Sequence, residues 1–123
     1  MDRLKIMISS TVNDLMDERD AVEVAINNFR FHRFRSESMG SLSRSPQEVC
    51  DEMARECDIF ILIVGESYGW VIPNLNISVT EREYNVAKET DSQKILIYCK
   101  SSSNREQRQV RFMEKVSNYS TGY

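Results

Sequence analysis

Residues 58–64 read DIFILIV, and every position after Asp58 is apolar. A continuous apolar run of this length, followed directly by Gly65, is typical of a parallel strand that is covered on both faces. A strand with one exposed face would instead alternate apolar and polar residues. We therefore expect residues 58–64 to form a central strand of a parallel sheet, with the neighbouring segments arranged around it.

Three further segments predict strands, and helical segments separate them. Residues 4–8 (LKIMI) and 94–99 (KILIYC) are apolar runs, whereas residues 30–35 (RFHRFR) alternate imperfectly and predict a strand near an edge. Capped or amphipathic stretches predict four helices, at residues 10–29, 45–57, 78–90 and 105–117. Alternating strands and helices indicate an α/β fold of three layers, a parallel sheet with helices on both faces. Right-handed crossovers favour the flavodoxin-like strand order 2-1-3-4.

Two of these helices have clear start signals. Ser10 or Thr11 is expected to cap the first helix, with Asp14 in its first turn facing the positive end of the helix. Ser45 is expected to cap the second, with Pro46 at the first helical position.

The chain length of 123 residues suits a single domain. Sheets of this kind usually have a fifth strand, and no strand is predicted after the last helix. We therefore expect residues 1–123 to be the N-terminal part of a longer protein, with an unfinished sheet edge that a partner covers. A small four-stranded domain is the alternative.

Composition excludes several classes of function. A net charge of -3 gives no electrostatic reason to expect binding to nucleic acid, and no apolar run reaches membrane-spanning length. The three cysteines fit no zinc spacing and are expected to be buried thiols in a reducing cytoplasm. No cluster of residues suggests a metal site.

A site is expected where the strand order reverses, at the carboxyl ends of the first and third strands. Three polar segments should converge there. They supply Ser9, Ser10 and Thr11 after the first strand, Gly65, Tyr68, Gly69 and Trp70 after the third, and Ser78, Thr80, Glu81 and Glu83 at the following helix start.

That helix start, residues 78–84 (SVTEREY), contains two overlapping capping boxes. If Ser78 is the N-cap, Glu81 is its reciprocal partner and Glu83 is free to face the crevice. If Thr80 is the N-cap, Glu83 is tied to the helix start. Either glutamate is therefore a candidate catalytic residue.

The chemistry of this set suits a nucleotide-like ligand. The single histidine, His32, is expected on the second strand, which argues against a Ser-His-Asp or Cys-His arrangement. Helix N-terminal amides can bind phosphate, an aromatic ring can stack on a base, and a carboxylate can stabilise a developing oxocarbenium ion. Arg19 and Arg44 could also contact phosphate, although surface ion pairs are the commoner role for such residues.

Four motifs in this order, ISSTVNDLMDERDAV, RSPQEVC, CDIFILIVGESYG and SVTEREYNVA, resemble a TIR-like domain family of unknown function. Such domains stand at the N-terminus of NACHT-type and related signalling or antiphage ATPases. More distantly, the chain is similar to TIR domains and nucleoside deoxyribosyltransferases, whose catalytic members carry a glutamate at the start of a helix. Their Thr-x-x-Glu pattern corresponds to Thr80 and Glu83, with Ala87 as the small residue, and Ser78 matches a serine of TIR enzymes. The TIR Trp-Cys pair is absent, so Glu81 remains the second candidate.

The resemblance implies two functions. One is an effector or signalling domain that cleaves NAD or a related nucleotide at its N-glycosidic bond and requires no other cofactor. The other is a non-catalytic module that acts by self-association or by transmitting ligand state. In both cases the expected partners are NTPase or sensor domains of the same longer chain, in the cytoplasm, without direct contact to nucleic acid or membrane.

Overall fold

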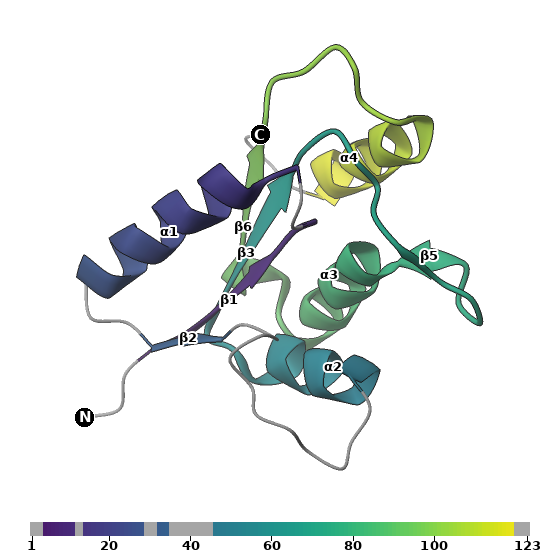
Figure 1. The fold of residues 1–123 in the computed structure, drawn as a ribbon. Coiled ribbons are helices and arrows are strands. Elements are labelled where there is room, and N and C mark those ends of the chain that lie inside the picture. Colours follow the sequence, from purple (N-terminus) through teal and green to yellow (C-terminus); the bar gives the residue numbers. More distant parts are fainter. Residues whose placement is uncertain (1–3, 12–13, 29–31, 35–45, 120–123) are drawn as a thin grey trace.

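The computed structural model describes residues 4–11, 14–28, 32–34 and 46–119. Its main sheet has four parallel strands in the order β2-β1-β3-β6 (Figure 1). The strands are β1 (Lys5–Ser9), β2 (His32–Phe34), β3 (Ile59–Val64) and β6 (Ile95–Cys99). This is the doubly wound order predicted from the sequence, with its reversal point between β1 and β3.

Helices cover both faces of the sheet and give the predicted three layers (Figure 1). Helix α1 (Met16–Asn28) lies on one face, and α2 (Pro46–Glu56), α3 (Val79–Thr90) and α4 (Gln107–Tyr119) lie on the other. A short 3-10 turn (Ser92–Lys94) joins α3 to β6. Lys94 Nζ donates to three carbonyl oxygens at the end of α2, those of Ala54, Arg55 and Cys57, and so satisfies acceptors that a helix C-terminus leaves open.

The position of the central strand β3 between two cores accounts for its apolar sequence. Phe60, Leu62 and Val64 pack into the larger core with α2, α3 and α4, whereas Ile61 and Ile63 pack into the smaller core beneath α1. Because successive side chains of a strand point to opposite faces, a strand between two helical layers must be apolar at every position.

Helix α1 begins later than predicted. It starts at Met16, so neither Ser10 nor Thr11 is its N-cap. The hydroxyl groups of these two residues bond locally instead, Ser10 to the Thr11 carbonyl oxygen and Thr11 to the Asp14 carboxylate. Short polar side chains can hydrogen-bond within a loop as readily as they can cap a helix. Here Ser10 and Thr11 bond within the loop.

The segment predicted as one loop, residues 65–77, contains a small antiparallel hairpin of β4 (Val71–Ile72) and β5 (Ile77–Ser78). Asn76 has a φ of 57°, a left-handed conformation that asparagine tolerates in turns. Strands of two residues are too short to show alternation in the sequence. The predicted cap Ser45 lies outside the described residues, but α2 begins at Pro46 as expected.

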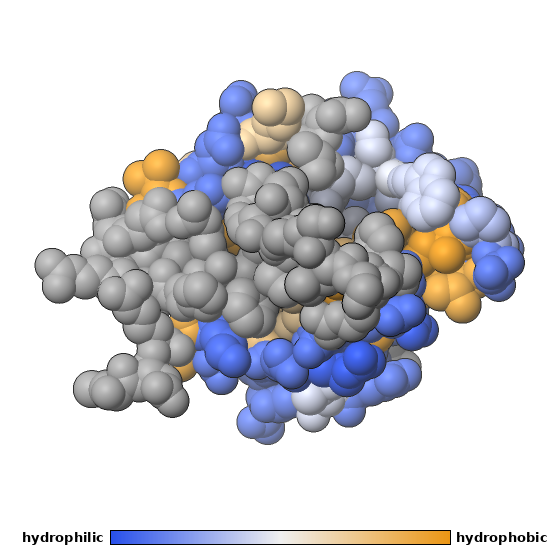
Figure 2. Space-filling model, turned by 60° about the horizontal axis from the view of Figure 1, so that its bottom comes forward, coloured by the Kyte–Doolittle hydropathy of each residue, from blue (hydrophilic) through white to orange (hydrophobic). Residues whose placement is uncertain are grey.

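The face drawn in Figure 2 carries both hydrophilic residues (blue) and hydrophobic residues (orange), and the hydrophobic ones gather at its left and right edges. Within the described ranges, no helix combines the length and apolar character needed to cross a membrane. Cys50 and Cys57 are buried free thiols as expected, whereas Cys99 at the end of β6 is exposed.

Candidate functional site

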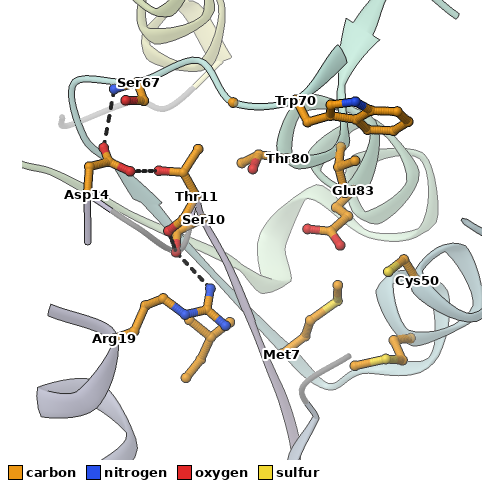
Figure 3. Close-up of a pocket in the computed structure, with 14 residues that line it drawn as sticks. Met7, Ser10, Thr11, Asp14, Arg19, Cys50, Ser67, Trp70, Thr80 and Glu83 are labelled. Atoms are coloured by element: carbon orange, nitrogen blue, oxygen red, sulfur yellow. Dashed lines mark hydrogen bonds between the residues drawn. The ribbon is translucent and has the colours of Figure 1, made fainter. Parts of the chain in front are cut away.

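A pocket of about 400 Å³ lies at the carboxyl edge of the sheet, beside the reversal point of the strand order (Figure 3). The three segments singled out in the sequence meet there. The lining residues are Met7, Ile8, Ser10, Thr11, Asp14, Arg19, Cys50, Met53, Ser67, Gly69, Trp70, Val79, Thr80 and Glu83. Polar and apolar groups both face the cavity, as they do in sites that bind small organic ligands.

The start of α3 decides which glutamate faces the pocket. Ser78 is the N-cap, and its side-chain oxygen accepts a hydrogen bond from the Glu81 backbone N–H at 3.0 Å. The reciprocal half of the predicted box is indirect, because the Ser78 N–H donates to the Tyr68 hydroxyl oxygen at 3.1 Å. That hydroxyl in turn donates to the Glu81 carboxylate. Glu83 takes no part in this cap.

Glu83 lies at the bottom of the pocket and is only 7% exposed. Ser9 Oγ donates to Glu83 Oε1 at 2.6 Å, and the Cys50 thiol also hydrogen-bonds to the carboxylate. Loss of hydration raises the pKa of Glu83 to about 7, against the opposing effects of these two bonds and of the Arg19 charge. Near neutral pH the carboxyl is therefore present in both protonation states.

The opposite wall is a network of polar groups after β1. Arg19 is 4% exposed, and its Nη1 donates to Ser10 Oγ at 2.8 Å. The Asp14 carboxylate accepts from the Thr11 hydroxyl and from the Ser67 backbone N–H at 3.2 Å. Asp14 thus ties the loop after β1 to the loop after β3, and both loops keep a fixed spacing across the pocket.

The mouth of the pocket carries Trp70, which is 67% exposed, and Thr80 also belongs to the lining (Figure 3). Gly69 has a φ of +93°, and a Cβ atom there would stand 2.7 Å from Thr11 Cγ2. Only glycine fits both this backbone conformation and this close approach.

Five of the predicted site residues do not line the pocket. Glu81 and Tyr68 bond to each other on the other side of α3, and Glu81 also pairs with Lys115 Nζ at 2.9 Å. Ser78 is 1% exposed and acts as the cap. Gly65 offers its carbonyl oxygen to side chains of the α4 region, Arg105 and Gln109. Ser9 does not line the cavity but reaches it through its bond to Glu83.

Sequence reasoning missed the parts that Asp14, Cys50 and Ser67 play in the pocket, and it ranked a phosphate contact of Arg19 below a surface ion pair. Only Arg19 left a usable signal. It stands four residues after the buried Leu15, in the apolar stripe of α1. A charged residue is rarely buried at such a position unless it has a partner or a function. The other contacts join segments far apart in the chain, such as Asp14 with Ser67, and have no local pattern.

The assembled groups can bind a sugar or nucleotide. The hydroxyls of Ser10, Thr11 and Thr80 can bond ribose, the guanidinium of Arg19 carries a positive charge, and the indole of Trp70 offers a stacking surface. Of the described part of the chain, Glu83 is the one glutamate that lines this pocket. Among the described residues, no group of three His, Cys, Asp or Glu side chains could hold a metal ion.

One family model matches the chain. It is described as a domain of unknown function (DUF4062), and it covers residues 5–122 of 123. No curated protein matches the chain. Because the description of the family assigns no activity, the function has to be argued from the geometry of the pocket.

Proposed function

The chain belongs to the DUF4062 family of domains of unknown function, and we propose that it binds a ribonucleotide such as NAD in the Glu83 pocket and hydrolyses its N-glycosidic bond. The observation that carries this proposal is the buried Glu83 carboxyl at the bottom of a cavity, with its pKa raised to about 7 by loss of hydration. Structural carboxylates rarely occupy such a position, whereas catalytic ones commonly do.

The proposed reaction needs one carboxylate. The bond between ribose C1′ and the nicotinamide nitrogen breaks, and its electron pair neutralises the positive charge of that nitrogen. Ionised Glu83 stabilises the positive charge that develops on the ribosyl ring. A water oxygen then bonds to C1′, and its proton passes to Glu83 and on to solvent. The products are nicotinamide, ADP-ribose and one proton.

In this scheme the other pocket residues each contact a different part of the substrate or position Glu83. Ser9 donates a hydrogen bond to Glu83 at 2.6 Å and so fixes the direction of its carboxyl group. Ser10 and Thr11 lie where ribose hydroxyls can bond, and Arg19 balances a phosphate charge. Trp70 at the mouth packs a base.

The wider setting of the proposal is a TIR-like effector or signalling domain of a cytoplasmic, NTPase-containing defence or signal-transduction protein. The doubly wound order β2-β1-β3-β6 and the Thr80-x-x-Glu83 pattern at the start of α3 are what support the likeness to TIR domains and nucleoside transferases. Self-association and contact with other domains of the same protein belong to this proposal.

A non-catalytic interaction module is the second candidate. The observation in its favour is that Glu83 is only 7% exposed and already bonded to Ser9, as a residue with a purely structural role would be. The two candidates differ in one measurable respect, which is turnover.

The test incubates the protein, in its full natural length and at a concentration that favours self-association, with NAD, and follows nicotinamide and ADP-ribose by chromatography. We expect nicotinamide release that falls by about a hundredfold or more in Glu83→Gln. Glu89→Gln, an exposed site on the same helix, removes an equal charge and should leave the rate unchanged. The rate should rise with pH through about 7, because ionised Glu83 is the active form.

Two results would count against catalysis. Glu83 would have no catalytic role if no nicotinamide were released, or if Glu83→Gln released it as fast as the wild type. Binding of ADP-ribose that Trp70→Ala weakens, without any turnover of NAD, would favour a nucleotide-sensing module instead.

A further inference from the structure

A second hollow, of about 290 Å³, lies between α3 and α4. Its polar lining is Arg108, Arg111 and Lys115 from α4 and Glu81 from α3, and the rings of Tyr68 and Phe112 also line it. We call this the basic groove. It is separate from the Glu83 pocket, since no residue with a described position lines both.

The two hollows lie on opposite sides of the first turn of α3. Successive residues of an α-helix are rotated by about 100°, so Glu81 and Glu83 point about 200° apart. Glu83 accordingly faces the pocket at the sheet edge, and Glu81 faces α4. One small ligand cannot contact both glutamates.

The charge of the basic groove is strongly positive in a chain whose net charge is -3. Arg108, Arg111 and Lys115 are spaced by three and four residues, which places them on one face of α4. Among the residues that the structure describes, Glu81 is the one carboxylate that lines the groove, and its partner there is Lys115. Three cations against one anion leave an excess of two positive charges.

Two of the three cationic groups, Arg108 and Lys115, are held in position before any ligand arrives. The Arg108 guanidinium lies over the Tyr68 ring at 4.6 Å and donates to the Asn76 carbonyl oxygen at 2.7 Å. Tyr68 in turn packs edge-on against Phe112. Lys115 Nζ donates to Glu81 at 2.9 Å and to Asn85 at 2.7 Å. A preorganised cation loses less side-chain entropy when an anion binds.

We propose that the basic groove is a second binding site, which takes a phosphate group carrying two or more negative charges. Guanidinium groups bind phosphate oxygens through pairs of parallel N–H bonds, and the two arginines and the lysine on one face of α4 supply cationic donors for a diphosphate. The site does not depend on the activity proposed for the Glu83 pocket. A phosphate bound here competes with Glu81 for Lys115. Its binding should therefore also change the hydrogen bonds that connect Glu81 through Tyr68 to Ser78.

The test titrates the full-length protein with inorganic pyrophosphate and measures affinity by calorimetry and by shifts of backbone amide resonances. We expect the largest resonance shifts at Glu81, Arg111 and Lys115. Arg111→Glu should weaken the affinity by about tenfold or more, since it replaces a charge-assisted donor with a like charge. Arg111 is exposed, so the variant should fold normally, and Arg108→Gln provides an independent second variant.

Two controls decide where and how the anion binds. Arg55→Glu changes the net charge equally at an exposed position on α2 and should change the affinity by no more than about twofold. Equal losses in Arg55→Glu and Arg111→Glu would mean that pyrophosphate responds only to overall charge, which overturns the proposal. Loss of binding in Arg19→Gln, with Arg111→Glu unaffected, would place the anion in the Glu83 pocket and overturns it as well.

Discussion

Replacing Glu83 by glutamine should make the protein more stable at neutral and alkaline pH, and the gain in stability should grow as the pH rises to about 7. The cause is the burial of an ionisable group. Glu83 is 7% exposed, and loss of hydration raises its pKa from 4.5 to about 7. In the unfolded chain the same carboxyl is hydrated and ionises at its ordinary pKa. Glutamine has nearly the same shape but never carries the charge.

The size of the effect follows from the two pKa values. Below pH 4.5 the carboxyl is protonated in both states, and its charge costs the folded state nothing. Between 4.5 and about 7 the folded state holds a proton that the unfolded state has released, so the free energy of unfolding falls as the pH rises. At about 1.4 kcal/mol per pH unit the loss reaches about 3 kcal/mol and is constant above pH 7. Glu83→Gln removes this loss.

The assay is urea unfolding of wild type and Glu83→Gln, followed by circular dichroism, at several values between about pH 5 and about pH 8. The stability difference should grow by about 2 to 3 kcal/mol over this range. Glutamine adds an N–H₂ group, but the cost of burying this group is the same at every pH and leaves the slope unchanged. Glu89→Gln, on the exposed side of α3, should show no such slope. A stability difference that does not vary with pH would refute the assignment of a raised pKa to Glu83.

Two further substitutions test the frame around the pocket. Gly69→Ala should lower the free energy of unfolding by about 1 to 3 kcal/mol in urea titrations, because φ is +93° and the new Cβ would stand 2.7 Å from Thr11 Cγ2; an unchanged midpoint would contradict this backbone conformation. Tyr68→Phe should cost about 1 to 3 kcal/mol, since the buried Ser78 N–H loses its acceptor. Tyr98→Phe, at an exposed tyrosine, is the control for Tyr68→Phe and should change stability little.

The fold could be predicted from the sequence because β3 packs side chains into two hydrophobic cores, one on each face of the sheet. Phe60 and Ile61 enter different cores, and this requirement leaves an unbroken apolar run that is easy to recognise. The strand order followed from general rules of chain connection rather than from any one residue. The hairpin after β3 was missed because its strands, Val71–Ile72 and Ile77–Ser78, are too short to show a period.

The site was less predictable because its decisive contacts are long-range. The two capping boxes in residues 78–84 are equally good as local patterns, and the choice between them rests on Tyr68, ten residues before the cap. Its hydroxyl group accepts from Ser78 and donates to Glu81, which fixes Ser78 as the N-cap. The predicted start of α1 was wrong for a different, local reason, since the Thr11 hydroxyl bonds to Asp14, three residues further on, within a loop.

The two glutamates of α3 show why Glu83 calls for a chemical explanation. Glu81 has a cation at 2.9 Å and a tyrosine hydroxyl, and these partners account for its charge. The cap of α3 is complete without Glu83, because Ser78 and Tyr68 supply it. Glu83 nevertheless keeps an ionisable group at a buried position, where ionisation costs about 3 kcal/mol at neutral pH. Glutamine could accept the Ser9 bond without that cost, so helix capping and packing do not require a carboxyl group here. A reaction that needs a carboxylate in the pocket would.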